Sequence, residues 1–263
     1  MKHLFGDWEN IQARIRQAEN LFLFLDYDGT LTPIVSRPGL AFCPAEVKRH
    51  LQRLRDLPRT YLAIISGRSL EDVREKVGVS GITYVGNHGL EIENPIGMHK
   101  KVPSPARKKE LKIITRDLKN SLKEIPGILF EEKGPILSVH YRSVRQKFLA
   151  QVRLVIEEKL QQWSDHWKMT SGKMVFEIRP KVDFNKGEAV KEILKALPPL
   201  KLLPIYLGDD QTDEDAFRSL KGRGISIFIG PGNFPSEAEF FLQNPDEVQE
   251  FLSRCQKVRS QSP

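Results

Sequence analysis

The sequence predicts an α/β protein whose core is a doubly wound, mostly parallel sheet of Rossmann-like topology with an inserted α+β cap domain. Short, continuous apolar runs such as "LFLFL" (21–25) are typical of strands buried on both faces of a parallel sheet. Amphipathic helical segments alternate with these runs, as in strand–helix–strand units. This alternation changes between residues 102 and 181. We therefore expect a core domain of residues 1–101 and 182–263 and an inserted domain at 102–181.

The first part of the core alternates helices with strands. Pro44 stands in the first turn of the second helix, a position that tolerates its missing N–H group. The segment "GRSLEDVREKV" (67–77) starts the third helix directly after a strand. The predicted helices are 7–20, 44–56 and the one that starts within 67–77, and the predicted strands are 21–25, 60–66 and 82–87.

The inserted block has a different order of elements, helix–strand–strand–helix–strand–strand. Its helices are expected at 106–124 and 144–163. Its first two strands are "GILFEEK" and "PILSVHYR", and its second pair, "HWKMTSG" and "KMVFEIRP", forms a hairpin that turns at Ser171-Gly172. The core then resumes with helices in "KGEAVKEILKAL" and "TDEDAFRSL" and strands in "LPIYLG" and "GISIFIG". A small domain inserted into a larger one indicates a cap that closes over a site on the sheet.

The composition is that of an ordinary soluble globular protein. The chain has 263 residues, of which 40% are hydrophobic and 29% charged. No apolar run approaches the ~18 residues of a membrane span, and the first twenty residues resemble no export signal. Only two cysteines, Cys43 and Cys255, are present, which excludes a disulfide framework and a cysteine-based zinc site. We expect a monomer in a reducing cytoplasm.

The net charge of +7 and the pI near 9.3 permit two interpretations. One is nucleic-acid binding, and the other is a basic surface suited to an anionic small molecule. The basic residues are dispersed, and the densest cluster, "RKKELK" (107–112), contains an acid and an apolar residue. This dispersal favours the small molecule over nucleic acid.

Polar clusters follow several of the predicted strands, where open α/β sheets bind ligands. Asp26 comes directly after a buried strand, a position suited to a carboxylate nucleophile that attacks phosphorus. Asp28 can return to the same pocket as general acid and then base, with Thr30 close by. The alternative is an acidic turn, because Asp-Gly is a common turn pair. The apolar strand that runs into "DYDGTL" favours the functional interpretation.

A second acidic cluster follows the strand "LPIYLG". Adjacent carboxylates such as Asp209 and Asp210 repel each other unless a cation lies between them, and Mg²⁺ prefers oxygen ligands of this kind. The alternative is an acidic helix N-terminus favoured by the helix dipole. That alternative explains Asp213 and the two acids after it, but it does not explain Asp209 and Asp210.

Two further residues gain meaning from this context. The hydroxyl of Ser66 and the N–H groups at the start of the next helix could form an anion site, although many helices simply begin with a capping serine. Lys186, in "DFNKGEAV", could neutralise a phosphate and the nearby carboxylates, although most lysines are solvated at the surface. We expect both to lie near the two acidic clusters.

With these clusters in order, the chain resembles the haloacid-dehalogenase-type phosphatases. The pattern is "DYDGT", then a serine at a strand end, then a lysine, then "GDDQTD". More narrowly, the chain is similar to the trehalose-6-phosphate phosphatase family in "LDYDGTLTPI", "IISGR", "GNHGLE", "HYR", "EIRP", "NKGEAV" and "GDDQTDEDAF". These segments span about residues 20 to 250, and the family's four-stranded cap fits the inserted block.

The resemblance implies a role for each matching residue. Asp26 would form the aspartyl-phosphate, and Asp28 would protonate the leaving sugar oxygen and then activate water. Mg²⁺ would be held by Asp26, the Asp28 backbone carbonyl and Asp209, with Asp213 supporting these ligands, and Ser66 and Lys186 would grip the phosphoryl oxygens. The resemblance further implies substrate-binding roles for Arg68, Asn87, His88, Lys133, Arg142, Lys173, Glu177 and Asp210.

These substrate-binding assignments keep their own alternatives. Lys133 and Lys173 could simply be hairpin-turn lysines, whereas Arg142 and Glu177 lie on predicted strands, where a charge needs more explanation. Asn87 and His88 would form part of the rim of the site.

The resemblance implies Mg²⁺-dependent hydrolysis of trehalose 6-phosphate, in functional pairing with a trehalose-6-phosphate synthase. A phosphatase of the same fold that acts on another sugar phosphate, such as sucrose 6-phosphate or mannosyl-3-phosphoglycerate, is the first alternative. A basic binding protein on a phosphatase-like scaffold is the second, and it would require the loss of a core carboxylate. Asp26, Asp28, Lys186 and Asp209 are all present.

Overall fold

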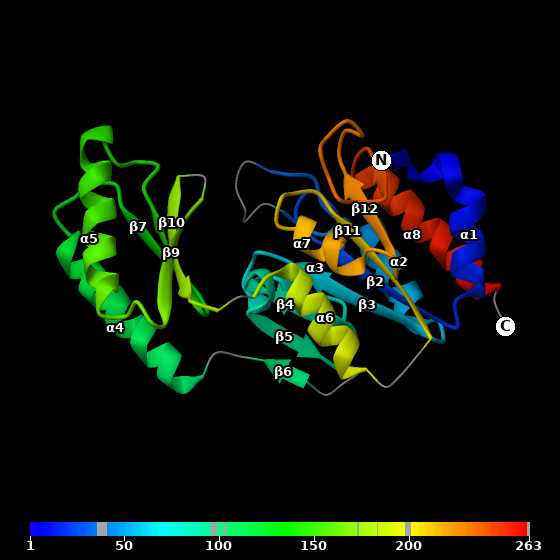
Figure 1. The fold of residues 1–263 in the computed structure, drawn as a ribbon, viewed down its shortest axis with the longest axis horizontal. Helices are drawn as coiled ribbons and strands as arrows, with labels where there is room; N and C mark the ends of the chain where they lie inside the picture. The colour runs from blue at the N-terminus through cyan, green and yellow to red at the C-terminus, as the bar shows by residue number, and fades with distance from the viewer. Residues whose placement is uncertain are drawn as a thin grey trace. The chain divides into compact units, whose positions relative to one another are not determined.

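A computed structural model of the chain describes residues 1–35, 41–95, 99–101, 104–172, 174–182, 184–197 and 201–261. The chain divides into two compact units (Figure 1). The larger unit consists of Met1–Lys101 and Phe184–Pro263, and the smaller unit consists of Val102–Asp183.

The larger unit is built on a nine-stranded sheet in the order β1-β13-β12-β11-β2-β3-β4-β5-β6. Along this order, neighbouring strands pair in parallel from β1 through β13, β12, β11, β2 and β3 to β4. Strands β5 and β6 continue the sheet in antiparallel pairing. This mainly parallel sheet confirms the predicted fold class. The strands are β1 (Lys2–His3), β2 (Asn20–Asp26), β3 (Thr60–Ile65), β4 (Thr83–Gly86), β5 (Glu91–Asn94), β6 (His99–Lys101), β11 (Leu202–Gly208), β12 (Ile225–Ile229) and β13 (Phe240–Leu242).

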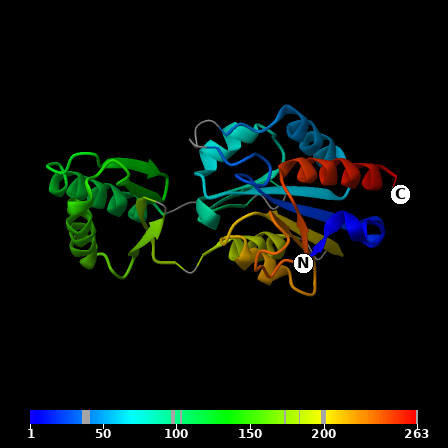
Figure 2. The ribbon, with the colours of Figure 1, turned by 90° about the horizontal axis from the view of Figure 1, so that it is seen from above.

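Helices cover both faces of this sheet (Figure 2). Strand β2 shows why its sequence is a continuous apolar run. Leu21, Leu23 and Leu25 enter one apolar core with α1, α2, α3 and α8, whereas Phe22 and Phe24 enter a second core with α6 and α7. The helices are η1 (Leu4–Asp7), α1 (Trp8–Gln17), α2 (Ala45–Asp56), α3 (Leu70–Val77), η3 (Asn87–Gly89), α6 (Lys186–Ala196), α7 (Glu214–Leu220) and α8 (Pro245–Ser260).

The strand order reverses direction between two neighbouring strands, β2 and β11. From β2 the chain proceeds to β3 and β4 on one side, and from β11 it proceeds to β12 and β13 on the other. Strands β2 and β11 are therefore parallel neighbours at the point where the winding reverses. Loops that leave such a pair diverge at the carboxyl ends of the strands, and ligands bind in the crevice between them.

The smaller unit contains a four-stranded antiparallel sheet in the order β7-β8-β10-β9 and, among its described residues, two α-helices. Its apolar core includes Leu118 and Ile156 from the helices and Val139 and Phe176 from the sheet. The order of elements along the chain is the predicted one. They are α4 (Pro105–Ser121), β7 (Leu129–Lys133), β8 (Ile136–His140), η4 (Gln146–Phe148), α5 (Leu149–Gln161), β9 (Trp167–Gly172) and β10 (Val175–Pro180).

Two details of the smaller unit differ from the prediction. Ser171 and Gly172 pair with Phe176 and Val175, so both belong to β9 and the predicted turn position is wrong. Arg142 lies in a turn two residues beyond the end of β8, and not on a strand. In both cases the cross-strand partners, which the local sequence does not reveal, decide where the strand ends.

Several elements of the larger unit were not predicted. Strands β1 and β13 are two and three residues long, and their pairing partners come from distant parts of the chain. Helix α8 begins after Asn244, whose side chain accepts hydrogen bonds from the backbone N–H groups of Asp246 and Glu247, with Pro245 in its first turn. This capping pattern was a usable signal.

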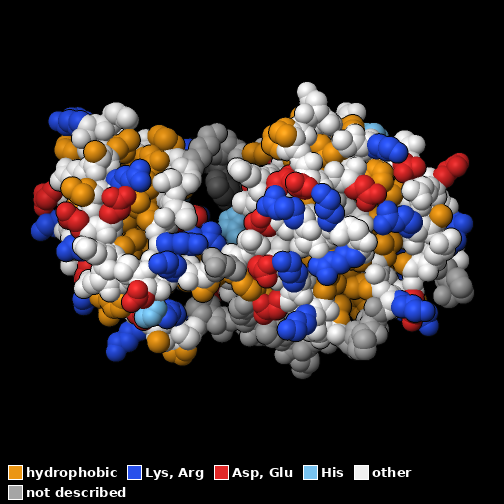
Figure 3. Space-filling view, viewed as in Figure 1, with side chains coloured by type: hydrophobic (Ala, Val, Ile, Leu, Met, Phe, Trp, Pro, Cys, Tyr) orange, Lys and Arg blue, Asp and Glu red, His pale blue; other side chains and the backbone are white. Residues whose placement is uncertain are grey.

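No helix among the described residues is both long enough and apolar enough to span a membrane. On the face drawn in Figure 3, lysines and arginines are interspersed with aspartates and glutamates. This mixture agrees with the dispersed charge of the sequence.

Candidate active site

Three carboxylates converge at the carboxyl ends of β2 and β11. Asp26 is the last residue of β2, Asp209 follows β11, and Asp213 lies one turn further along the chain. Each offers an oxygen atom within 4.8 Å of the others. Burial and the repulsion of its neighbours raise the pKa of Asp26, and burial with repulsion by Asp213 and Asp210 raises the pKa of Asp209 to about 7. The site therefore concentrates negative charge where water cannot solvate it well.

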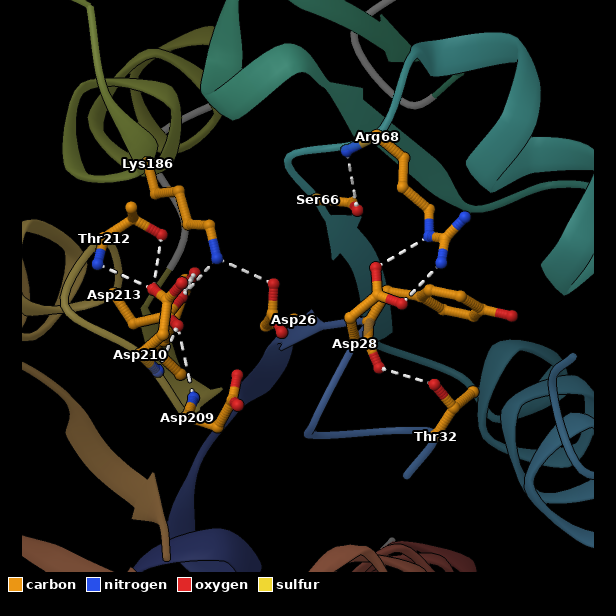
Figure 4. A network of polar contacts seen from close by, with 12 residues as sticks. Asp26, Asp28, Thr32, Ser66, Arg68, Lys186, Asp209, Asp210, Thr212 and Asp213 are labelled. Atoms are coloured by element: carbon orange, nitrogen blue, oxygen red, sulfur yellow. Dashed lines mark hydrogen bonds and ion pairs between the residues drawn. The ribbon is translucent and has the colours of Figure 1, made fainter. Parts of the chain in front are cut away.

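Lys186 supplies a positive charge at this centre (Figure 4). It is the first residue of α6, and its side chain is only 3% exposed. Its Nζ donates to Asp26 Oδ1 at 2.7 Å and to Asp213 Oδ1 at 2.8 Å. Burial alone would lower the pKa of Lys186, but the surrounding carboxylates raise it, so the ammonium stays charged. The alternative of a solvated surface lysine is excluded.

Asp213 uses both of its oxygens to organise the centre. Oδ1 accepts hydrogen bonds from Lys186 Nζ and from the Tyr206 hydroxyl, the latter at 2.6 Å. Oδ2 accepts from the backbone N–H groups of Asp209 and Asp210, at 3.2 and 3.1 Å. Four donors thus occupy a fully buried carboxylate. Asp213 therefore fixes the neighbouring ligands more than it offers a free lone pair.

Tyr206 is a site residue that the sequence analysis missed. It lies on β11 and is completely buried. Burial and the nearby Asp213 raise its pKa, so the hydroxyl keeps its proton and donates a hydrogen bond to Asp213. Its place in the strand "LPIYLG" gave the appearance of an ordinary core residue. The usable signal was a tyrosine, with a polar end, in a strand otherwise buried on both faces.

Asp28 lies apart from this centre and is held by Arg68. Arg68 Nε and Nη2 donate to the two oxygens of Asp28, both at 2.6 Å. Arg68 Nη1 also donates to Asp72 Oδ2 at 2.8 Å. The Asp28 side chain is 40% exposed, whereas that of Arg68 is 10% exposed. The bidentate pair gives Asp28 a defined orientation at the edge of the site.

Ser66 follows β3 and is 1% exposed. Its Oγ accepts from the backbone N–H of Arg68 at 3.1 Å. It does not cap the next helix, because Ser69 does so by accepting from the N–H of Asp72. The loop of Ser66 lies beside the turn of Asn87 and His88.

Asp210 faces a different partner from its neighbours. Its Oδ1 accepts from the backbone N–H and the hydroxyl of Thr212, both at 2.6 Å. Although burial opposes ionisation, Lys186 and these hydrogen bonds lower the pKa of Asp210. In this structure Asp210 closes the turn between β11 and α7.

The centre fits a divalent cation. Three carboxylates share one ammonium, so negative charge remains uncompensated, and hard oxygen ligands suit such an ion. A side chain at Gly29, whose φ is +84°, would overlap the Asp209 carboxylate, so only glycine permits this approach. Among the described residues, the buried Thr30 Oγ1 is one of the side-chain atoms without a hydrogen-bond partner. Asp26 and Asp209 could therefore hold a metal ion, with Asp213 beside them fixing the Asp209–Asp210 segment.

The expected sugar-binding residues belong to the smaller unit. Lys133 and Glu177 lie on β7 and β10, and Lys133 Nζ approaches Glu131 Oε2 at 3.4 Å. Arg142 is exposed in its turn, and Lys173 lies outside the described residues. Within this unit, His140 Nε2 also lies 2.8 Å from Glu131 Oε2.

The arrangement suits phosphoryl transfer. Asp26 offers a carboxylate at a strand end, Lys186 offers a fixed positive charge beside it, and Asp28 offers a second carboxylate at the edge of the site. Nearby cationic and N–H groups can stabilise the charge of a transferred phosphoryl group.

Known proteins are similar to this chain in both sequence and fold. Trehalose-phosphate phosphatase B of Arabidopsis thaliana is 36% identical over 253 residues, which cover 90% of this chain and 67% of that protein. The structure of Aspergillus fumigatus trehalose-6-phosphate phosphatase (crystal form 3) matches with a TM-score of 0.71 and 27% identity over 98% of this chain and 99% of that chain. A haloacid dehalogenase-like hydrolase from Bacteroides thetaiotaomicron matches over 89% of this chain and 98% of that one, with a TM-score of 0.62 and 14% identity, which shows the fold alone.

The family model of trehalose-phosphatases matches residues 24–246, a span that contains Asp26, Ser66, Lys186 and Asp209. The chain therefore belongs to the trehalose-phosphatase family.

Proposed function

We propose that this chain hydrolyses trehalose 6-phosphate to trehalose and phosphate, with Mg²⁺ as cofactor. Family membership over residues 24–246 is the observation that carries the substrate, and the buried centre supports the chemistry. The free cysteines Cys43 and Cys255 support a reducing compartment such as the cytoplasm. We further propose that it acts as a monomer on the product of a trehalose-6-phosphate synthase.

In the first half of the proposed reaction, an Asp26 oxygen attacks phosphorus and the bond to the sugar oxygen breaks. Protonated Asp28 gives its proton to that oxygen, and trehalose leaves. In the second half, Asp28 takes a proton from water, whose oxygen attacks phosphorus and breaks the bond to Asp26. Phosphate leaves, and Asp26 and Asp28 return to their starting states.

Other residues bind and orient the phosphoryl group. Lys186, held between Asp26 and Asp213, donates to a phosphoryl oxygen when the substrate is bound. Ser66 donates through its hydroxyl, since its oxygen already accepts from Arg68 N–H. Mg²⁺, held by Asp26, the Asp28 carbonyl and Asp209, would neutralise charge on the phosphoryl group. Asp213 supports these ligands through the backbone N–H groups of the Asp209–Asp210 segment.

We propose that the smaller unit is a cap domain that selects the sugar. Lys133, Arg142, Lys173 and Glu177 are the residues we propose for the sugar hydroxyls. Closure of such a domain would exclude bulk water during the reaction. Asp210, Arg68 and His88 are proposed to line the entrance of the site from the larger unit.

Phosphate release from a panel of sugar phosphates tests this function. The panel contains trehalose 6-phosphate, sucrose 6-phosphate, glucose 6-phosphate and mannosyl-3-phosphoglycerate, each with Mg²⁺ and with EDTA. We expect Mg²⁺-dependent release mainly from trehalose 6-phosphate and none from the Asp26→Asn variant. Preference for another member would refute the substrate but keep the mechanism. Equal release by Asp26→Asn would refute Asp26 as the nucleophile.

A further inference from the structure

The turn beside Ser66 has an unusual backbone. Asn87 and His88 are consecutive residues with φ of 50° and 56°, in the left-handed region. Residues other than glycine adopt this region at an energetic cost, which neighbouring contacts must offset. Two such residues in succession therefore point to a function for the shape of the turn.

The turn holds both ends of the Ser66–Arg68 loop. The backbone N–H of Asn87 donates to the Arg68 carbonyl at 2.6 Å, and that of His88 donates to the Ser66 carbonyl at 3.0 Å. A side chain at Gly67 would come within 2.6 Å of the His88 ring, so the loop and the turn are in close contact. The left-handed backbone aims two successive N–H groups at the carbonyl groups of Ser66 and Arg68, the residues on either side of Gly67.

Asn87 is locked by a carboxylate from the next strand. Its side chain is completely buried, and Nδ2 donates to Glu91 Oε2 at 2.7 Å. The same Glu91 oxygen accepts from the backbone N–H of Leu70, at the start of α3, at 3.3 Å. Glu91 thus joins the turn to the helix that follows the Ser66 loop, and the loop is held from both sides.

We propose that Asn87 and Glu91 are positioning residues that fix the Ser66 hydroxyl for the phosphoryl group. This inference rests on the proposed function, in which Ser66 donates to a phosphoryl oxygen. It gives Asn87 a positioning role in place of the expected rim contact, because its buried side-chain amide donates to Glu91. The effect on phosphate passes through the two backbone hydrogen bonds from the turn to the loop.

An exchange of donor and acceptor tests this pair. Asn87→Asp removes the Nδ2 donor and places two carboxylates together, so inorganic phosphate in the presence of Mg²⁺ should bind about ten-fold more weakly, about 1.4 kcal/mol. The double variant Asn87→Asp/Glu91→Gln restores one amide and one carboxylate with their places exchanged. Its new amide oxygen can still accept from Leu70 N–H. Phosphate affinity, measured by calorimetry, should return to within about two-fold of wild type.

The effect of Asn87→Asp on phosphate affinity should depend on the presence of the Ser66 hydroxyl. Ser66→Ala weakens phosphate binding by itself if the proposed function is right. Adding Asn87→Asp to Ser66→Ala should then weaken it little further, because both changes remove the same contact. Thr83→Val is the matched control, since it breaks the buried Thr83–Asn94 hydrogen bond of 2.9 Å on the same β4–β5 hairpin. It should lower the denaturation midpoint but not the phosphate affinity.

The outcomes separate the two proposals. If Ser66→Ala binds phosphate as tightly as wild type, the role given to Ser66 is wrong and the positioning inference is refuted with it. If Ser66→Ala weakens binding but the double exchange brings no recovery, only the positioning inference is refuted. Additive losses in the Ser66→Ala background, or an equal loss in Thr83→Val, would also overturn it, because both indicate a general loss of stability.

Discussion

Replacing Lys186 by methionine should destabilise the larger unit far more than removing any ordinary lysine. The Lys186 ammonium is 3% exposed and donates to Asp26 and Asp213, which are themselves 6% and 0% exposed. Methionine fills a similar volume but leaves both carboxylates without their charged partner. Breaking a buried ion pair by removing one member costs about 3–5 kcal/mol, because the remaining charge stays desolvated.

The matched control is Lys191→Met on the same helix. Lys191 is 50% exposed and pairs with Glu188 one turn away. An exposed pair of this kind contributes about 0.3–0.5 kcal/mol. The two variants therefore remove the same charge from one helix, and they differ about ten-fold in expected cost.

Urea unfolding in the presence of EDTA measures the free energy of unfolding of both variants. At about 2–4 °C per kcal/mol for a chain of this size, Lys186→Met should also lower the thermal midpoint by roughly 10 °C. Adding Asp213→Asn to Lys186→Met should recover part of the loss, since it removes one of the two stranded charges. A loss below about 1 kcal/mol for Lys186→Met, or no recovery in the double variant, would refute the view that Lys186 compensates the buried acids.

Two further predictions concern the hydroxyl of Tyr206 and the carboxyl of Glu110. Tyr206→Phe removes only the donor to Asp213 Oδ1, so kcat for trehalose 6-phosphate should fall about ten-fold with KM little changed. Phe217→Leu, which changes the buried ring beside Tyr206 but keeps the hydroxyl, should leave kcat unchanged, and equal kcat values for all three proteins would contradict this role. Although burial opposes ionisation, hydrogen bonds from Arg107 and Trp167 lower the pKa of Glu110 below 4.5, so its contribution is present above pH 4.5 and is lost as the pH falls through the lowered pKa. Glu110→Gln should therefore cost about 1 kcal/mol at pH 7 and nothing once the pH has fallen below the lowered pKa. Urea unfolding across this pH range measures the cost, and a loss that does not change with pH would show that the charge is irrelevant.

The strand-end position of each acid could be predicted from the sequence, and so could the fold class. A buried run followed at once by Asp26 or Asp209 fixes the residue to the carboxyl edge of a parallel sheet, whatever the neighbouring strands are. The burial of Lys186 was not predictable in the same way. A lysine at a helix start is ordinarily solvated, and only the approach of Asp26 and Asp213, 160 and 27 positions away along the chain, makes it a buried partner.

The residues that the sequence analysis missed all act through another residue. Tyr206 contacts Asp213 and Glu91 contacts Asn87, so each acts on the site through a neighbouring residue. Neither belongs to a sequence pattern that indicates contact with a ligand. Local patterns also failed where cross-strand pairing decides the end of a strand, as at the β9–β10 turn and at Arg142. The glycines of "GNHG" can be read from the sequence, but the left-handed backbone of Asn87 and His88 between them could not be predicted from it.

The charges of the centre imply how substrate and cation bind. Asp26, Asp209 and Asp213 can contribute three negative charges against the single positive charge of Lys186, and Asp213 is already satisfied by four donors. A phosphate monoester brings about two more negative charges at neutral pH. Its entry beside Asp26 and Asp209 would be strongly repelled unless a divalent cation entered with it or before it. Under the proposed function, we therefore expect a divalent cation to be required for binding the substrate as well as for turnover, because the carboxylates that would hold the cation are the ones that would otherwise exclude the phosphate.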